Sequence, residues 1–142
     1  MSKKANLSIE ENLLVKQTLV IIPCYNMNNL IQKTVSDLKV FFENILIVDD
    51  YSNKKVSDLN FPENVDIVRH QFNTGQGGAI QTGIYIFKNK FKQCNYLVTF
   101  DADCQHRAID AFEMLKKIHS KKVGLVIGTR FKSKESISEI PP

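Results

Sequence analysis

Short runs of hydrophobic residues recur along the chain, and longer segments of mixed polarity separate them. The runs are four or five residues long and rich in Val, Ile and Leu, which is typical of buried strands. These runs predict five strands, at residues 18–22, 45–48, 65–68, 96–100 and 123–127.

Three of the intervening segments repeat their hydrophobic residues every three or four positions, which predicts amphipathic helices. The hydrophobic stripes are Leu30, Ile31, Val35, Leu38 and Phe42; Ala79, Ile80, Gly83, Ile84 and Phe87; and Ile109, Phe112, Leu115 and Ile118. Strands that alternate with helices favour a doubly wound parallel sheet. The predicted fold class is therefore α/β, Rossmann-like, with a mainly parallel sheet flanked by helices. Residues 1–17 are predicted as a polar lead-in and residues 132–142 as a polar tail.

Each predicted strand is followed directly by a polar segment. The segments are PCYN at 23–26, DDYS at 49–52, HQFNTGQGG at 70–78, DADCQH at 101–106 and GTR at 128–130. In an open parallel sheet, the carboxyl ends of the strands share one edge, and ligands bind in the crevice there. We therefore expect Pro23, Asp50, Gly75, Asp103 and Arg130 to lie along one edge around a binding site.

Asp101 and Asp103 are separated by a single residue, Ala102. From an extended segment the two carboxylates point the same way and can share a cation. Hard oxygen ligands suit Mg²⁺ or Mn²⁺, which bind through one or two carboxylates and substrate phosphates. For an isolated Asp pair, a role in a turn or helix cap is the alternative. Nearby His106 is either a further ligand or a residue that supports the ligands.

A second acidic pair, Asp49 and Asp50, suits the N–H of a uracil or the hydroxyls of a ribose. Turn formation before Ser52 is the alternative for either residue. The glycine-rich segment 75–79 resembles a phosphate cradle, but it lacks the full dinucleotide and P-loop patterns. Arg130 is either a bidentate phosphate contact or a surface charge.

Charge and composition narrow the class of partner. The net charge of +4 is carried by scattered lysines without interleaved aromatic residues, which argues against a nucleic-acid surface and leaves weak attraction to an anionic membrane open. The 3 cysteines have no metal-like spacing and indicate reduced thiols in the cytoplasm. The hydrophobic runs are far shorter than the ~20 residues of a membrane helix, and no signal peptide is evident. We expect a cytoplasmic protein, either free or peripheral at the inner face of a membrane.

Five segments, in this order and spacing, resemble glycosyltransferase family 2, especially the branch that makes polyprenyl- or dolichyl-phosphate sugars. They are VIIPCYN, ILIVDDYS, NTGQGGAIQTGI, FDADCQH and GTRF. The resemblance implies that residues 18–131 form a GT-A half-domain that binds a UDP- or GDP-sugar with Mg²⁺ or Mn²⁺. It further implies transfer of the sugar to a polyprenyl-phosphate or glycan acceptor, with Asp101 and Asp103 as metal ligands. The nucleotide-sugar-binding residues that it implies are Pro23, Tyr25, Asp49, Asp50, Gly75, Gln76, Asp101, Ala102 and Arg130.

The sequence departs from the family pattern at Met27, where an acidic residue is common, and at Tyr51, where glycine is common. After Asp103 no general base is evident, since Asp110 and Glu113 are typical of a helix surface. An ionised phosphate acceptor needs no base. Alternatively, the C-terminal acceptor side is missing, and such a fragment would bind the nucleotide sugar without transferring it. An Asp-nucleophile phosphatase is the remaining alternative, disfavoured because its motif normally follows the first strand.

Overall fold

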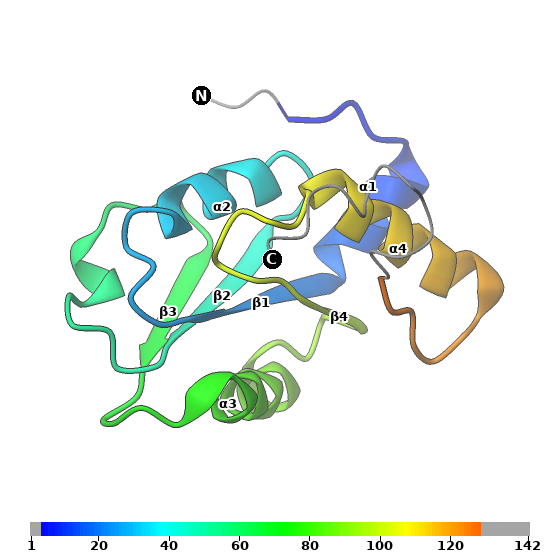
Figure 1. Cartoon of the computed structure of the whole chain (residues 1–142). Coiled ribbons are helices and arrows are strands. Elements are labelled where there is room, and N and C mark those ends of the chain that lie inside the picture. The colour runs from blue at the N-terminus through cyan, green and yellow to red at the C-terminus, as the bar shows by residue number, and fades with distance from the viewer. Residues whose placement is uncertain (1–3, 129–142) are drawn as a thin grey trace, which may run out of the picture.

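Strand β1 (Thr18–Cys24) lies in the interior of a parallel sheet whose order is β3-β2-β1-β4 (Figure 1). The computed structural model describes residues 4–128. The other elements are α1 (Ile9–Lys16), α2 (Ile31–Leu38), β2 (Asn44–Asp49), the 3₁₀ turn η1 (Val56–Asp58), β3 (Val65–Arg69), α3 (Gly75–Lys90), β4 (Tyr96–Thr99) and α4 (Ala108–Lys121). All three strand pairings are parallel, so the predicted α/β fold is confirmed.

The two faces of the sheet are covered by different helices. Because side chains alternate along a strand, Leu19 and Ile21 of β1 belong to one hydrophobic cluster and Val20 and Ile22 to the other. Helix α3 packs on the first face, and α1, α2 and α4 lie on the second (Figure 1). Most residues of the predicted helical stripes therefore lie in the core, but Leu30, at the start of the first stripe, is 38% exposed.

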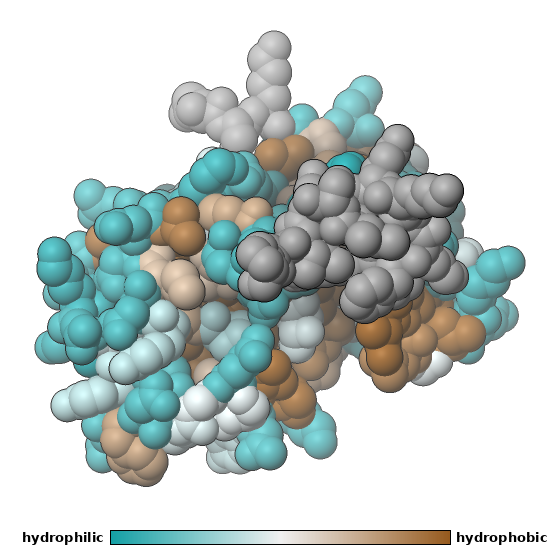
Figure 2. All heavy atoms as spheres, in the orientation of Figure 1, coloured by the Kyte–Doolittle hydropathy of each residue, from teal (hydrophilic) through white to brown (hydrophobic). Residues whose placement is uncertain are grey.

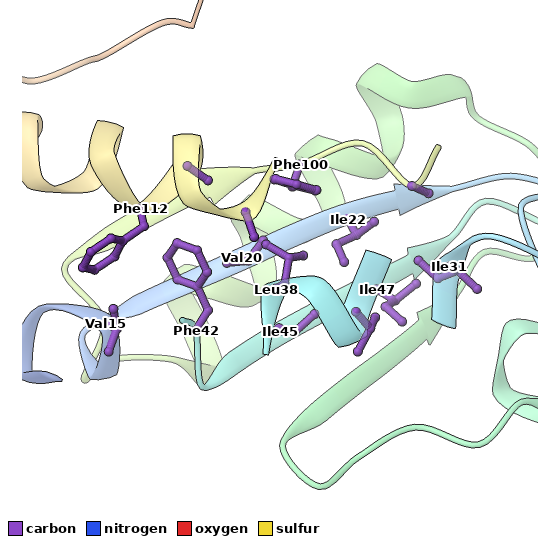
Figure 3. Packing of buried hydrophobic residues seen from close by; sticks show 14 of the residues in the cluster. Val15, Val20, Ile22, Ile31, Leu38, Phe42, Ile45, Ile47, Phe100 and Phe112 are labelled. Atoms are coloured by element: carbon purple, nitrogen blue, oxygen red, sulfur yellow. The ribbon is translucent and has the colours of Figure 1, made fainter. Parts of the chain in front are cut away.

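The larger cluster lies between the sheet and helices α2 and α4. Figure 3 shows Val20 and Ile45 beneath these helices, together with Phe42 and Phe112. The ring of Phe112 also stacks on Phe41, with centroids 5.1 Å apart. Fully burying one such side chain contributes about 1.5–3 kcal/mol, so this cluster is a main source of the domain's stability.

Helix α1 is fixed at its start by a capping box. Ser8 Oγ accepts from the Glu11 amide at 3.2 Å, and Glu11 Oε2 accepts from the Ser8 amide at 2.9 Å. Its Leu14 and Val15 side chains are buried, and Glu11 forms an ion pair with Lys116 of α4 at 3.5 Å. The stretch predicted as a polar lead-in therefore contains a helix that packs on the domain.

The prediction of a fifth strand at residues 123–127 is wrong for this structure. The segment follows α4 without regular structure, and Val123, Leu125 and Ile127 are 45%, 71% and 78% exposed. Figure 2 shows hydrophobic atoms gathered on the surface over this segment. A hydrophobic run becomes a strand only where its backbone groups find a neighbouring strand. Among residues 4–128 this segment pairs with none.

Gly83 allows α3 to lie directly on β1. A Cβ at this position would lie 2.6 Å from Cγ2 of Ile21. We therefore expect Gly83→Ala to lower the free energy of unfolding by about 1–3 kcal/mol, because overpacking in a dense core outweighs the gain in helix propensity. Urea unfolding monitored by circular dichroism measures the change.

Gly77 is the matched control in the same helix, because a Cβ there would meet nothing within 4 Å. Gly77→Ala is expected to leave stability unchanged or raise it by up to about 1 kcal/mol. Equal stabilisation by the two substitutions would show that the contact between Gly83 and Ile21 does not limit the packing of α3.

Candidate functional site

The loops after all four strands leave the sheet at the same edge. Cys24, Asp49 and Arg69 stand in register at the ends of β1, β2 and β3. The pattern continues one residue further, where the Asp50 amide donates to the Cys24 carbonyl at 2.8 Å and the His70 amide to the Asp49 carbonyl at 2.9 Å. The parallel register therefore brings distant segments of sequence together, as predicted.

A cleft of about 490 Å³ opens at this edge, a volume within the range of small-molecule sites. Its lining is Pro23, Cys24, Tyr25, Met27, Asp50, Asn73, Gly75, Gln76, Ala79, Asp101, Ala102 and Asp103. Most of the predicted site residues therefore line one cleft. Asp49 does not line it, and Arg130 lies outside the described residues. Burial raises the pKa of the Cys24 thiol to about 11, so this thiol is protonated at neutral pH and does not supply a thiolate nucleophile.

The two carboxylates of the Asp-x-Asp segment have different partners. Asp101 Oδ1 accepts from Gln76 Nε2 of α3, and Asp101 Oδ2 lies 2.9 Å from His106 Nε2. Asp103 Oδ1 accepts from the Gln105 amide at 2.9 Å. His106 therefore contacts a carboxylate of the predicted metal pair.

A side chain of helix α2 binds the backbone of the same segment. The hydroxyl of buried Thr34 donates to the Ala102 carbonyl at 3.1 Å. The next residue but one, Cys104, has a positive φ of 62° and lies with its Sγ 3.3 Å from the same hydroxyl. Thr34 thus fixes the turn that presents Asp101 and Asp103.

Asp49 is fully buried and is used inside the fold. Its carboxylate forms an ion pair with Arg69 and accepts from the amides of Ser52 at 2.9 Å and Val56 at 3.2 Å. Burial alone would raise the pKa of the Asp49 carboxyl, but hydrogen bonds from Ser52, Arg69 and Val56 hold this pKa below its ordinary value. The geometry gives Asp49 the role of anchoring the loop after β2.

Tyr51 contacts the same arginine, Arg69, that pairs with Asp49. Its φ of 67° lies in the left-handed region, which strongly favours glycine over an aromatic residue. The Arg69 guanidinium lies 5.1 Å from the centre of the Tyr51 ring, a cation–π contact that offsets part of the strain. The residue in this unusual position is the same one that departs from the family pattern.

Asp50 faces the cleft, but its carboxylate is surrounded by donors from the loop after β3. Oδ1 accepts from the Thr74 amide and hydroxyl, both at 2.8 Å, and Oδ2 accepts from the Gly75 amide at 2.7 Å. His70 Nδ1 lies 2.7 Å from Oδ1. Burial opposes ionisation, yet the hydrogen bonds from Thr74, His70 and Gly75 hold the pKa of Asp50 below its ordinary value.

These partners of Asp50 were missed in the sequence as functional residues. His70 and Thr74 lie within the polar segment 70–78, in which the sequence pattern predicted a role only for the glycine-rich part. In the structure, two of those glycines stand where a larger residue would be strained or would clash. Gly75 has a φ of +79°, and a Cβ on Gly78 would lie 2.4 Å from Thr74 Oγ1. Both glycines permit the turn that packs Thr74 against the helix.

A second hollow, of about 700 Å³, lies beside the loop at 53–59. Asn28 and Gln32, two of its amide side chains, donate to the backbone carbonyls of Lys54 and Asn60. Its lining contains no pair of carboxylates comparable to Asp101 and Asp103. The first cleft is therefore the candidate site.

The sequence matches the family model described as glycosyl transferase family 2 over residues 19–142. This chain belongs to glycosyltransferase family 2. The match contains β2, β3, β4 and all of β1 except Thr18, and it contains every segment that lines the cleft.

Two relatives align with most of the chain. An uncharacterized protein of Methanocaldococcus jannaschii is 34% identical, covering 98% of this chain and 56% of its own length. The UDP-N-acetylglucosamine–dolichyl-phosphate N-acetylglucosaminyltransferase of Methanococcus voltae is 30% identical, covering 89% of this chain and 57% of its own. This family 2 chain thus spans about half the length of the curated relatives it matches.

A more distant relative and a solved structure extend the comparison. The dolichyl-phosphate β-glucosyltransferase of Dictyostelium discoideum is 28% identical, covering 78% of this chain and 39% of its own length. The crystal structure of S. aureus TarS 1–349 superposes with a TM-score of 0.57 at 16% identity, covering 82% of this chain and 40% of that one. The predicted GT-A fold is confirmed. Within residues 4–128, no helix is both long and apolar enough to cross a membrane.

Proposed function

We propose that the cleft binds the diphosphate-linked sugar donor of a glycosyltransferase, together with a divalent cation at Asp101 and Asp103. One observation carries the proposal. Two neighbouring carboxylates, a glycine-rich helix start and the polar ends of β1 and β2 line a single cleft at the carboxyl edge of a parallel sheet. That edge is where open α/β sheets bind nucleotides.

The donor atoms at the cleft fit a hard divalent cation. Asp101 and Asp103 supply carboxylate oxygens, and no group of three or more His, Cys, Asp or Glu side chains converges as a candidate metal site within residues 4–128. Mg²⁺ and Mn²⁺ suit such a partial set, because they keep waters and take the remaining ligands from substrate phosphates. When bound, the cation would neutralise charge on the diphosphate leaving group. In this proposal, Gln76 and His106 orient Asp101.

The relatives support a polyprenyl phosphate as the acceptor. The names of two of them specify transfer to dolichyl phosphate, and one specifies a UDP-linked donor. A phosphate acceptor is ionised at neutral pH and attacks without a general base. This chemistry agrees with a cleft whose acidic side chains all have partners in the fold. A UDP-sugar is therefore the first donor to test, with a GDP-sugar as the comparison.

The decisive variant is Asp103→Asn. Loss of the Asp103 carboxylate is expected to weaken Mn²⁺-dependent binding of UDP by at least about 100-fold. Removing a residue that only supports a metal ligand weakens metal binding by up to about 100-fold, and removing a ligand itself is expected to cost at least as much. The fold is expected to persist, because the asparagine oxygen still accepts from the Gln105 amide. Isothermal titration of the purified chain with UDP, with and without Mn²⁺, measures the change.

Asp110→Asn is the matched control, because the Asp110 side chain is exposed on α4 and its ion pair within residues 4–128 is with Arg107, at 3.5 Å. It is expected to bind UDP like the unaltered chain. Unchanged Mn²⁺-dependent affinity in Asp103→Asn would remove the metal assignment. Absence of UDP and GDP binding in the unaltered chain would remove the donor assignment.

A further inference from the structure

His70 lies behind the cleft, where it connects β3, Asp50 and helix α3. Its side chain is 13% exposed and does not line the cleft. Nδ1 lies 2.7 Å from Asp50 Oδ1, and Nε2 lies 2.8 Å from the hydroxyl of Thr82 on α3. The imidazole therefore bridges two elements that meet at the site.

The surroundings fix which ring nitrogen carries the proton. An ionised carboxylate only accepts hydrogen bonds, so Nδ1 of His70 donates to Asp50. In the neutral ring, Nε2 then accepts from the Thr82 hydroxyl. With the ring neutral, hydrogen bonds run in one direction, from Thr82 through His70 to Asp50.

The turn at residues 71–75 depends on Asp50, the last residue in this series of hydrogen bonds. Gln71 to Gly75 are all exposed, and Phe72 is 68% exposed, so hydrophobic packing contributes little to holding them. Their fixed points include hydrogen bonds to Asp50, donated by the amides of Thr74 and Gly75, by the Thr74 hydroxyl and by the Asn73 side chain, which binds the Asp50 carbonyl at 3.2 Å. The Thr74 hydroxyl also lies 3.0 Å from Nδ1 of His70, so the imidazole contacts the turn directly as well. Segments with few buried contacts open most readily.

We propose that His70 is a positioning residue, which orients the Asp50 carboxylate and thereby fixes the turn at 73–75 that forms one wall of the cleft. Nucleotide binding then depends on an imidazole that does not touch the ligand. The part of the proposal that concerns nucleotide binding rests on the proposed function. The part that concerns the turn stands on its own.

Two amide substitutions separate the roles of the ring nitrogens. The shorter side chain of His70→Asn places its N–H₂ near the position of Nδ1 and can still donate to Asp50, whereas His70→Gln places its amide near Nε2. Thr82→Val removes the hydroxyl that orients the ring. The control is His119→Gln, a histidine on α4 that contacts the Tyr96 hydroxyl at 2.8 Å, at the start of β4.

Hydrogen exchange of the Thr74 and Gly75 amides, measured without ligand, reports on the turn. His70→Gln is expected to raise both exchange rates about tenfold or more, because it removes a hydrogen bond to a charged group. His70→Asn is expected to restore most of the protection, Thr82→Val to raise exchange by a smaller factor, and His119→Gln to change neither amide. UDP affinity with Mn²⁺ is expected to follow the same order.

The proposal is overturned if His70→Gln leaves both amides protected, or if His70→Asn exposes them as much as His70→Gln while urea unfolding shows equal global stability. Loss of protection without loss of UDP affinity would overturn the link to nucleotide binding. If the unaltered chain binds no nucleotide, the proposed function fails, and the exchange rates still decide what His70 does for the turn.

Discussion

Arg69→Met is expected to lower the free energy of unfolding by about 3–5 kcal/mol, because it leaves the buried charge of Asp49 without its partner. Asp49 is completely inaccessible, and Arg69 also donates to the Ser52 carbonyl at 2.9 Å. Methionine retains much of the hydrophobic bulk of arginine, so the loss reports on charge, hydrogen bonding and the cation–π contact with Tyr51. Urea unfolding at neutral pH measures it.

The same strand and its neighbouring helix provide a matched control. Lys90 of α3 pairs with Asp66 of β3 at 2.6 Å, but the two side chains are 62% and 39% exposed. Lys90→Met is expected to cost less than about 1 kcal/mol, as for other solvent-exposed ion pairs. Equal losses in the two variants would mean that the burial of Asp49 does not set the strength of its pair.

Acidification below about pH 4 is expected to destabilise the domain steeply through Asp49 and Asp50. Both carboxyls have pKa values below their ordinary value in the fold, so the unfolded chain binds protons more readily than the folded one. Their contribution to stability is complete above the ordinary carboxyl pKa, near 4. It is lost as the pH falls through the lowered values. Urea unfolding from pH 7 to pH 3 follows this loss.

Asp50→Asn tests the assignment to these carboxyls. The variant is expected to be less stable at pH 7 and to lose less of its remaining stability between pH 5 and pH 3, because one of the two linked protonations is absent. An acid response identical to that of the unaltered chain would assign the sensitivity to other carboxyls.

The hydrophobic pattern was sufficient to predict the parallel sheet and the edge at which the site lies. It was not sufficient at residues 123–127, whose composition resembles that of β1. The two segments differ in whether a neighbouring strand meets them, and a run of Val, Ile and Leu does not contain that information. The positions of α2, α3 and α4 were predictable because a stripe of side chains requires only one covered face.

The acidic pair after β2 shows why the details of the site were harder to predict. Asp49 and Asp50 are adjacent and of the same type, but neighbouring side chains in extended backbone point to opposite sides. Which of them faces the cleft depends on Arg69, a partner 20 residues away. His70 was missed for a similar reason, since Asp50 and Thr82, which its two ring nitrogens contact most closely, lie 20 and 12 residues away.

The place of β1 in the sheet implies an order in which the domain assembles during synthesis. Its pairing with β2, and that of β2 with β3, involve residues 18–69 only, whereas its other neighbour, β4, begins at Tyr96. Contacts between distant segments form later, because closing a longer loop costs more entropy. β1, β2 and β3 can therefore pair before β4 joins the sheet. Asp101 and Asp103 follow β4 directly, so the cleft is complete only after β4 has joined the sheet.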